Sequence, residues 1–169
     1  MISHTILKTS LMGDLLLVAK AGGLIGVYFR GCEHAPEPSP DWKFDPACPV
    51  LQQAGKQLGE YLAGTRAEFS VPVCHAGTEF QNKIWQQIAG IPFGETITYT
   101  ELAGRAGAPD AVRAAGTATG RNPLSIIIPC HRVVGKDGGT GGYAGGLNRK
   151  RRLLELETNQ QNRAGVAHD

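Results

Sequence analysis

The sequence predicts an α+β fold, and three observations lead to that class. Short apolar stretches near the N-terminus alternate with glycine-containing turns, a pattern typical of an antiparallel sheet. A longer stretch over 51–62 has apolar residues at helical spacing. The chain after residue 76 carries two helix-start signals. We therefore expect an N-terminal α/β domain over 1–76 and a mostly helical domain over 77–169.

The expected first domain contains an antiparallel meander and one helix. Gly13-Asp14 and Gly22-Gly23 are turn signals that separate the apolar stretches. The segment 31–49 is rich in proline and lacks periodicity, which favours a loop. Gly64 is expected to end the helix. The expected elements are strands over 5–7, 15–19 and 24–29, a helix over 51–62, and a short strand over 69–73.

Two capping boxes mark helix starts in the expected second domain. Thr78 and Gln81 form one, and Thr98 and Glu101 form the other. In each, the N-cap hydroxyl and the side chain three residues later satisfy free N–H groups of the helix start. The first box opens a helix with apolar residues at 80, 84 and 88, and the second opens a short helix through 103. Asp110 is expected to cap a third helix over 111–120.

The second and third of these helices form a helix-turn-helix candidate, because a Gly/Pro turn at 107–109 joins them. The third helix consists largely of alanine and glycine, and Arg113 stands out from it. A helix this slim buries little area but can approach another surface closely. An ordinary pair of core helices is the alternative interpretation.

The charge distribution favours a polyanion partner. The chain has a net charge of only +2, but its basic residues gather between Tyr99 and Arg152. Solvated surface charge is the alternative that this pattern leaves open. The acidic residues in this stretch are Glu101, Asp110 and Asp137. The basic residues are Arg105, Arg113, Arg121, Arg132, Lys136, Arg149, Lys150, Arg151 and Arg152.

Composition also bears on compartment and metal content. No apolar run is long enough to span a bilayer, and the first residues lack a signal-peptide pattern, so we expect a cytoplasmic protein. In that reducing compartment the four cysteines are interpreted as thiols rather than disulfides. No spacing typical of metal ligands is present, so no metal site is expected. The residues considered for this were Cys32, Cys48, Cys74, His34 and His75.

Cys130 is the candidate nucleophile. It follows a β-branched run at 126–128 and precedes His131 and Arg132, which are expected to lower the pKa of its thiol. Neighbouring residues of a strand point to opposite faces, so either the chain bends at Pro129 or a water bridges Cys130 to His131. A third group must orient the imidazole, and Glu155 or Glu157 could do so. Without further signals, a buried structural cysteine is the alternative.

The segment Pro129-Cys130-His131-Arg132-Val133 resembles the active-site signature of the O6-alkylguanine-DNA alkyltransferases. Further residues match that family in order and spacing, and the resemblance is close from about Gly77 to Glu157. The matching motifs are Gly77-Thr78, Phe80-Gln81, Trp85, Ile91-Pro92, Gly94, Tyr99, Leu102-Ala103, Arg113-Ala114, Gly116, Asn122-Pro123, Gly142-Tyr143 and Gly145-Gly146.

The resemblance implies an RNase H-like antiparallel sheet with a helix in the N-terminal domain, and a winged-helix-like C-terminal domain. It implies irreversible, stoichiometric transfer of an alkyl group from O6-alkylguanine in double-stranded DNA, with O4-alkylthymine as a further candidate lesion, to Cys130. The base would be flipped through the minor groove. No small-molecule cofactor and no membrane partner are expected. A monomer is expected, and clustering on DNA is left open.

Individual roles follow from the same resemblance. Cys130 would accept the alkyl group, His131 would be a water-bridged base, and Glu157 would orient it. Asn122 would brace the turn beneath the cysteine, and Tyr99 would donate a hydrogen bond to the flipped base. The implied substrate-binding residues are Tyr99, Cys130, Val133, Tyr143 and Ala144. The implied DNA-binding residues are Tyr99, Arg113, Ala111, Ala114, Gly116 and Arg121.

Two other functions remain as alternatives. Alkyltransferase-like proteins bind damaged DNA but lack the acceptor cysteine, which this chain has. A Cys-His hydrolase would turn over, and that interpretation leaves Arg113 and the slim helix unexplained. Departures from the family pattern at Thr140, Gly141 and Ala144 leave the range of alkyl groups open. Ala115 stands where a valine is more usual, which reduces the packing behind the third helix. The tail after Asn159 is polar and is expected to be mobile.

Overall fold

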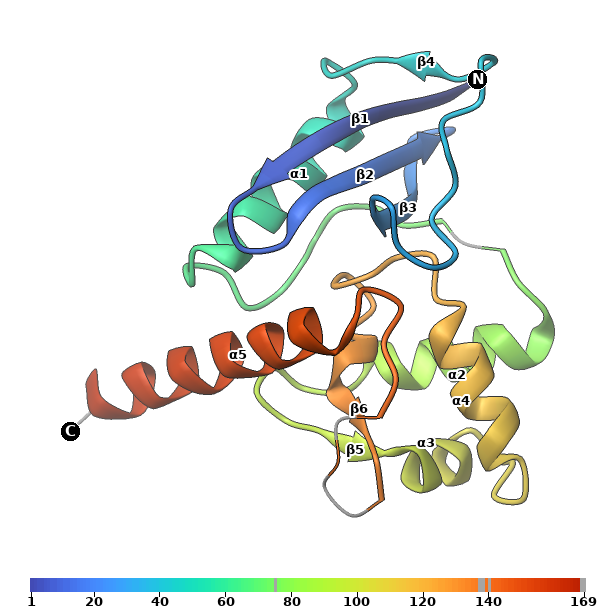
Figure 1. The fold of residues 1–169 in the computed structure, drawn as a ribbon, viewed down its shortest axis with the longest axis vertical. Helices are drawn as coiled ribbons and strands as arrows, with labels where there is room; N and C mark the ends of the chain where they lie inside the picture. The colour runs from blue at the N-terminus through green and yellow to red at the C-terminus, as the bar shows by residue number, and fades with distance from the viewer. Residues whose placement is uncertain (75, 137–138, 140, 168–169) are drawn as a thin grey trace. The chain divides into compact units, whose positions relative to one another are not determined.

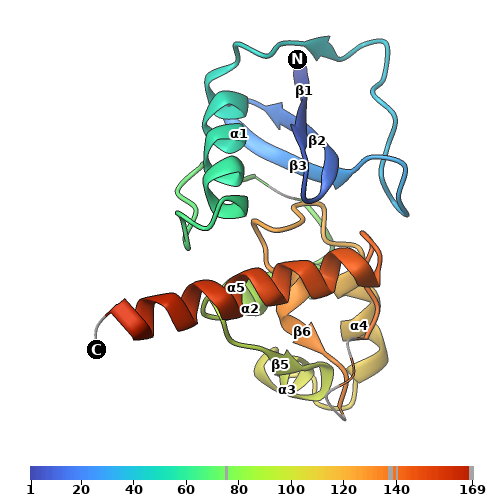
Figure 2. The same cartoon turned by 60° about the vertical axis from the view of Figure 1, so that its left-hand side comes forward.

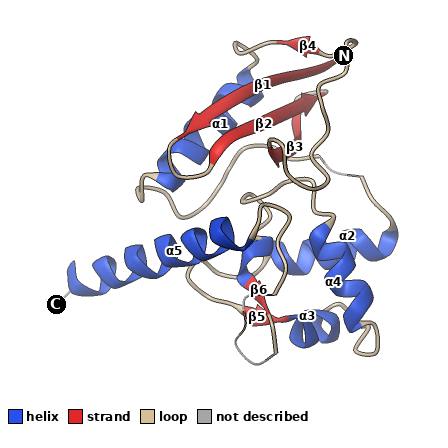
Figure 3. Cartoon of the chain, viewed as in Figure 1, coloured by secondary structure: helices blue, strands red, loops and turns tan. Residues whose placement is uncertain are grey.

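A computed structural model describes residues 1–74, 76–136, 139, 141–167 of the chain. Its contacts divide the chain into two compact units, one of residues 1–76 with 123–127 and one of residues 77–122 with 128–169. The first unit is a sheet with a helix, and the second is mostly helical (Figures 1 and 3). This mixture of an antiparallel sheet with separate helices confirms the predicted α+β class.

The sheet of the first unit has the strand order β3-β2-β1-β4. Strands β1 (Ile2–Thr9), β2 (Gly13–Lys20) and β3 (Gly23–Phe29) form the antiparallel meander that the turn signals predicted. Helix α1 (Pro49–Leu62) packs along this sheet (Figure 2). Its apolar stripe faces the core, and Gly64 follows its end with a φ of +82°. The buried residues of that helix are Leu51, Ala54, Gln57, Leu58 and Tyr61.

Two expectations for the first unit are wrong. The predicted loop over 31–49 contains a short strand, β4 (Lys43–Phe44), which pairs in parallel with β1. The predicted strand over 69–73 is absent, and Val73 makes only an isolated bridge to Leu24. Pro72 has no N–H for a ladder. The buried Gln57 side chain instead accepts from the N–H groups of Ser70 and Val71.

Residues 123–127 belong by their contacts to the first unit, whereas the predicted division puts them in the second domain. The N–H of Val27 donates to the carbonyl of Pro123, and the N–H of Ser125 donates to the carbonyl of Val27. Leu124 is fully buried there. Such pairing between distant segments cannot be recognised from local sequence.

The second unit contains α2 (Glu79–Ala89), β5 (Ile97–Thr98), α3 (Tyr99–Arg105), α4 (Val112–Gly120), η1 (Cys130–Arg132), β6 (Val133–Val134) and α5 (Leu147–Ala167). Both predicted capping boxes are present, at Thr78 and Thr98. The expected cap at Asp110 is wrong. Helix α4 begins one residue later, after Ala111, and no side chain caps it. Ala111 instead closes a turn by donating its N–H to the Ala108 carbonyl.

Helix α5 positions part of the site and is longer than expected. The segment after Asn159, expected to be a mobile tail, continues the helix to Ala167. Helices α3 and α4 pack together, and the Trp85 indole of α2 donates to the Ala118 carbonyl of α4 at 2.9 Å. Within the described ranges, no helix combines the length and hydrophobicity of a bilayer-spanning segment.

Candidate active site

A bend in the backbone presents Cys130. Residues Cys130–Arg132 form a single 3-10 turn rather than a strand, so the backbone bends here, which was one of the two alternatives that the sequence left open. Just before it, Ile126 has a φ of +71°, which is strained for a β-branched residue. The side-chain amide of Asn122, just beyond α4, donates to the Ile128 carbonyl at 2.8 Å. That bond links Asn122, which follows the end of α4, to the segment that precedes Cys130.

The thiol of Cys130 lies in a buried, polar-lined position. Burial raises its pKa, and hydrogen bonds with the side chains of Asn122 and Tyr143 and the charge of Lys150 offset only part of this effect. The expectation that His131 and Arg132 lower the pKa of this thiol is therefore wrong. The Arg132 guanidinium is engaged elsewhere, because it is bonded to a carboxylate. The raised pKa favours the thiol at neutral pH, so a nucleophilic role for Cys130 would require its deprotonation.

His131 is fully buried and bonded to Glu157, whose oxygen Oε2 lies 2.6 Å from its Nε2. Sequence reasoning alone left Glu155 and Glu157 as candidates, and the structure brings Glu157 to the imidazole while Glu155 is exposed. Burial lowers the pKa of His131, although Glu157 counteracts this. The ring is therefore neutral at neutral pH. Since the carboxylate can only accept, Nε2 carries the proton and Nδ1 is the basic nitrogen.

Arg132 forms a bidentate ion pair with Glu157. Its Nε and Nη2 each lie 2.9 Å from a carboxylate oxygen, and the backbone N–H of Gly94 donates to the same carboxylate at 3.1 Å. Burial alone would raise the pKa of Glu157, but the bonds from His131 and Arg132 outweigh it and hold that pKa at about 2. The carboxylate stays ionised across the physiological range.

Lys150 is a site residue that the sequence pattern predicted only as one of the basic residues facing a polyanion or solvent. It is 0 % exposed, and its Nζ donates to the carbonyls of Val133 (2.6 Å) and Gly142 (3.1 Å). Burial lowers its pKa to about 8, against the opposing effect of Cys130. A helical signal could have found it, because Lys150 and Glu157 lie seven residues apart and so share one face of α5.

Tyr99, at the start of α3, contacts the loop that contains Gly141 and Gly142. Its hydroxyl donates to the Gly142 carbonyl at 3.4 Å, and its ring lies 5.9 Å from Lys150 Nζ. Burial, followed by the charge of Cys130, raises the pKa of this phenol. Gly141 has a φ of +67°, and a Cβ there would lie 2.8 Å from the Tyr99 hydroxyl. Glycine at 141 thus permits the close approach of the loop to Tyr99.

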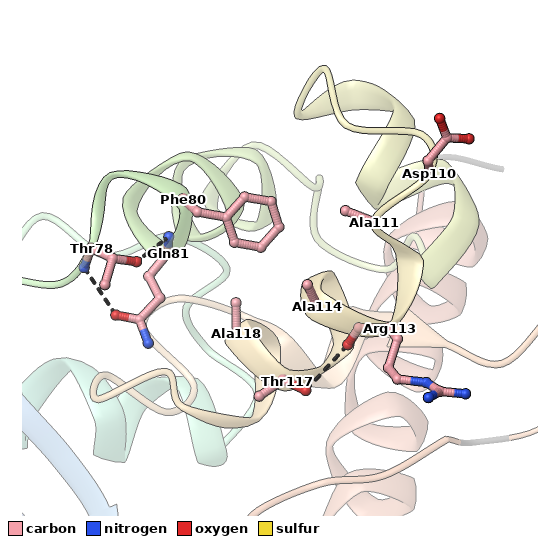
Figure 4. A pocket seen from close by; sticks show the side chains of 9 residues that line it. All are labelled: Thr78, Phe80, Gln81, Asp110, Ala111, Arg113, Ala114, Thr117 and Ala118. Atoms are coloured by element: carbon pink, nitrogen blue, oxygen red, sulfur yellow. Dashed lines mark hydrogen bonds between the residues drawn. The ribbon is translucent and has the colours of Figure 1, made fainter.

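Apart from Tyr99, the predicted DNA-binding residues lie on helix α4 or next to its ends. Arg113, Ala114 and Arg121 are exposed, and Ala111 and Gly116 are half-buried. Beside them an open groove of about 590 Å³ runs between the start of α2 and helix α4. Figure 4 shows the alanines of α4 lining this groove opposite Phe80, with the Arg113 guanidinium directed away from them. The groove is lined by Thr78, Phe80, Gln81, Asp110, Ala111, Arg113, Ala114, Thr117 and Ala118.

Two of the nine basic residues between Tyr99 and Arg152 are buried and do not contribute to a surface for a polyanion. They are Arg132 and Lys150.

The four cysteines, all of which are described, are not joined by disulfides, as predicted. Ala144 is half-buried in the loop before α5, and the Val133 carbonyl is engaged with Lys150. Thr140 lies outside the described residues.

Comparisons with known proteins give consistent results. A family model described as "6-O-methylguanine DNA methyltransferase, DNA binding domain" matches residues 79–159. A "methylated-DNA–protein-cysteine methyltransferase" of Mycobacterium tuberculosis is 46% identical over 147 residues, which are 86% of this chain and 87% of that protein. A protein of the same name from Methanosarcina barkeri is 42% identical over 152 residues, 88% of this chain and 92% of the relative.

Solved structures agree with this similarity. A crystal structure of Mycobacterium tuberculosis OGT in complex with DNA superposes with a TM-score of 0.84 at 40% identity, covering 94% of this chain and 93% of that one. An O6-methylguanine DNA methyltransferase from Methanococcus jannaschii superposes with a TM-score of 0.63 at 29% identity, covering 91% and 93%. The similarity therefore extends over both units.

Proposed function

The chain belongs to the methylated-DNA–protein-cysteine methyltransferase family, and from this premise we propose that it repairs DNA by transferring the alkyl group of O6-alkylguanine to Cys130. The observation that carries the proposal is the buried thiol of Cys130 in a 3-10 turn whose next residue, His131, is bonded to Glu157. The substrate is double-stranded DNA that contains the lesion. No resident cofactor is part of the proposal.

The transfer is a displacement at the alkyl carbon. The thiol proton passes to Nδ1 of His131, through a bridging water as the family resemblance implies, and the sulfur attacks the carbon. The bond from that carbon to O6 breaks as the bond to sulfur forms, and its electron pair returns to the purine. The guanine anion then takes a proton from the Tyr99 hydroxyl, and the phenolate is reprotonated as the imidazolium of His131 releases the thiol proton. The products are guanine in DNA and a thioether at Cys130.

The surrounding groups are proposed to bind the flipped base. Tyr143 would form a wall, the N–H of Ala144 would donate to O6, and the carbonyls of Cys130 and Val133 would accept from the exocyclic amine. The Val133 carbonyl already accepts from Lys150, but a carbonyl has two lone pairs and can take a second donor. Tyr99 would exchange its bond to Gly142 for one to the base and so stabilise the leaving guanine.

The exposed face of α4 is proposed to enter the minor groove. Alanine and glycine at Ala111, Ala114 and Gly116 allow a close approach, and Arg113 would fill the space that the extruded guanine leaves. Arg121, exposed just beyond the helix, would neutralise a phosphate. Flipping is required by the chemistry, because a buried thiol cannot reach the O6 substituent of a stacked base.

The test is the intact mass of the protein after incubation with duplex DNA that holds one O6-methylguanine, followed by peptide mapping. The expected result is a gain of one methyl group per molecule, at Cys130, with no turnover. DNA binding without a mass gain would instead support a damage-binding protein. Multiple turnovers of an ester substrate by the unmodified protein would support the hydrolase alternative.

A further inference from the structure

Arg132 has every side-chain nitrogen engaged inside the second unit. Nε and Nη2 donate to the two oxygens of Glu157, both at 2.9 Å, and Nη1 donates to the Ile91 carbonyl at 2.7 Å. Its guanidinium carbon also lies 5.6 Å from the centroid of the Phe93 ring. Arginine presents its donors in a rigid planar fork, so this pattern fixes both the position and the rotation of the partner carboxylate.

The partner carboxylate is the one that orients the proposed base. Glu157 accepts from His131, twice from Arg132 and from the Gly94 N–H, so Arg132 supplies two of its donors. Ile91 and Gly94 belong to the turn after α2, and this turn is bonded to both members of the ion pair. A histidine–carboxylate pair depends on such outer contacts for its geometry.

We propose that Arg132 is a positioning residue for the alkyl transfer: it holds the Glu157 carboxylate against His131 and balances the negative charge that this carboxylate presents to the imidazole. This inference rests on the proposed function for its kinetic consequence, whereas its effect on His131 can be measured in the unreacted protein.

The electrostatic part of the argument follows from the groups that face His131. Glu157 and Lys150 approach from α5, and Cys130 and Arg132 are its neighbours in η1. Burial lowers the pKa of His131, Glu157 raises it, and Arg132 and Lys150 lower it. An unopposed buried carboxylate would favour the imidazolium, which cannot accept a proton. Arg132 therefore adds to the effect of burial in favouring the neutral imidazole, while the bond from His131 to Glu157 is retained.

Two substitutions separate the charge from the geometry. Arg132→Gln removes the charge and keeps one amide donor, whereas Arg132→Lys keeps the charge and loses the planar fork. Arg66→Gln is the matched control, because Arg66 also bonds a glutamate, Glu60, and a backbone carbonyl, but in the first unit. Circular dichroism tests whether each variant is folded.

The first readout is the His131 pKa, from NMR of ring-labelled histidine at a series of pH values, with the signal assigned by its loss in His131→Gln. The second is the pH profile of methyl transfer from O6-methylguanine DNA. In Arg132→Gln the His131 pKa is expected to rise by about one unit, and the acid limb of the profile to move with it. In Arg132→Lys the pKa is expected to stay within about half a unit while transfer slows about tenfold, because one ammonium cannot hold both oxygens. Arg66→Gln is expected to match the wild type in both.

An unchanged His131 pKa in folded Arg132→Gln would overturn the charge-balancing role. If that variant does not fold, Arg132→Lys decides, and a wild-type transfer rate in it would overturn the positioning role. Failure of the proposed function itself is recognised separately, because the wild type would then transfer no methyl group at any pH while the His131 pKa values remain measurable.

Discussion

The Nζ atom of Lys150 lies 2.6 Å from the carbonyl oxygen of Val133 and 3.1 Å from that of Gly142. One buried ammonium thus connects α5 with β6 and with the loop that contains Gly142. The arrangement satisfies two carbonyls and the charge together, which is the condition under which a buried lysine is tolerated. It also places a positive charge where the Cys130 thiolate would form, because Lys150 is one of the groups that lower the pKa of that thiol.

Lys150→Met is therefore expected to destabilise the protein. It removes the charged donor of both carbonyls but keeps most of the apolar volume, so we expect a loss of about 2 kcal/mol in the free energy of unfolding. Urea denaturation at pH 7 measures this loss. Lys136→Met is the control, because Lys136 is exposed and should change stability by less than about 0.5 kcal/mol. Equal stabilities of the two variants would contradict the structural role of Lys150.

Cys130→Ala is expected to abolish methyl transfer and to leave binding to O6-methylguanine DNA within about threefold of the wild type, since only the sulfur is removed. Mass spectrometry and a fluorescence binding titration measure the two properties. Cys32→Ala, in the first unit, serves as the control and should transfer normally. Residual methylation of Cys130→Ala would assign the acceptor to another cysteine.

Arg113→Ala is expected to slow repair of duplex DNA by about tenfold or more, because the side chain proposed to replace the flipped base is lost. Its reaction with free O6-benzylguanine should be unchanged, since no flipping is needed there. Single-turnover kinetics with both substrates provide the test, with Arg30→Ala as an exposed control. A parallel loss with the free base would show that Arg113 acts on the thiol site instead.

The free energy of unfolding is expected to fall as the pH decreases from about 4.5 to about 2. The upper value is the ordinary pKa of a glutamate, and the lower value is the pKa of Glu157 in the folded protein. Between these values the unfolded chain binds the proton and the folded protein does not, so stability increases with pH in this window. The full contribution is present above pH 4.5 and amounts to about 3 kcal/mol. Urea titrations at several pH values should reveal the corresponding slope. Glu157→Gln should lose this part of the slope, whereas Glu155→Gln, at an exposed position, should retain it.

The features that sequence predicts well here are local. Thr78 and Thr98 cap their helices through bonds that span three residues, so the pattern contains all the partners. The two turns of the meander, at Gly13-Asp14 and Gly22-Gly23, are also specified by neighbouring residues. Asp110 shows the limit, because a good capping residue was available but the preceding turn moved the helix start to the next position.

The features that sequence could not predict depend on burial and on distant partners. Nothing in the local pattern distinguishes Arg132 and Lys150 from the exposed Arg151 and Arg152, yet both are buried by tertiary packing. Strand β4 spans two residues and exists only because β1 offers an edge. The family resemblance supplied Glu157 as the partner of His131, but it did not supply Arg132 as the partner of Glu157.

The placement of residues 123–127 has a consequence for dissecting this protein. The chain leaves the second unit after Asn122, contributes Leu124 to the sheet unit through its bridge to Val27, and returns at Ile128, just ahead of the acceptor cysteine. A truncated chain starting at Gly77 would carry a five-residue segment whose packing partners it does not encode. Proteolysis near residue 76 would likewise leave the fragments held together by noncovalent pairing. Inactivity of an isolated C-terminal half would therefore reflect an orphaned segment next to the nucleophile, rather than an absent catalytic group.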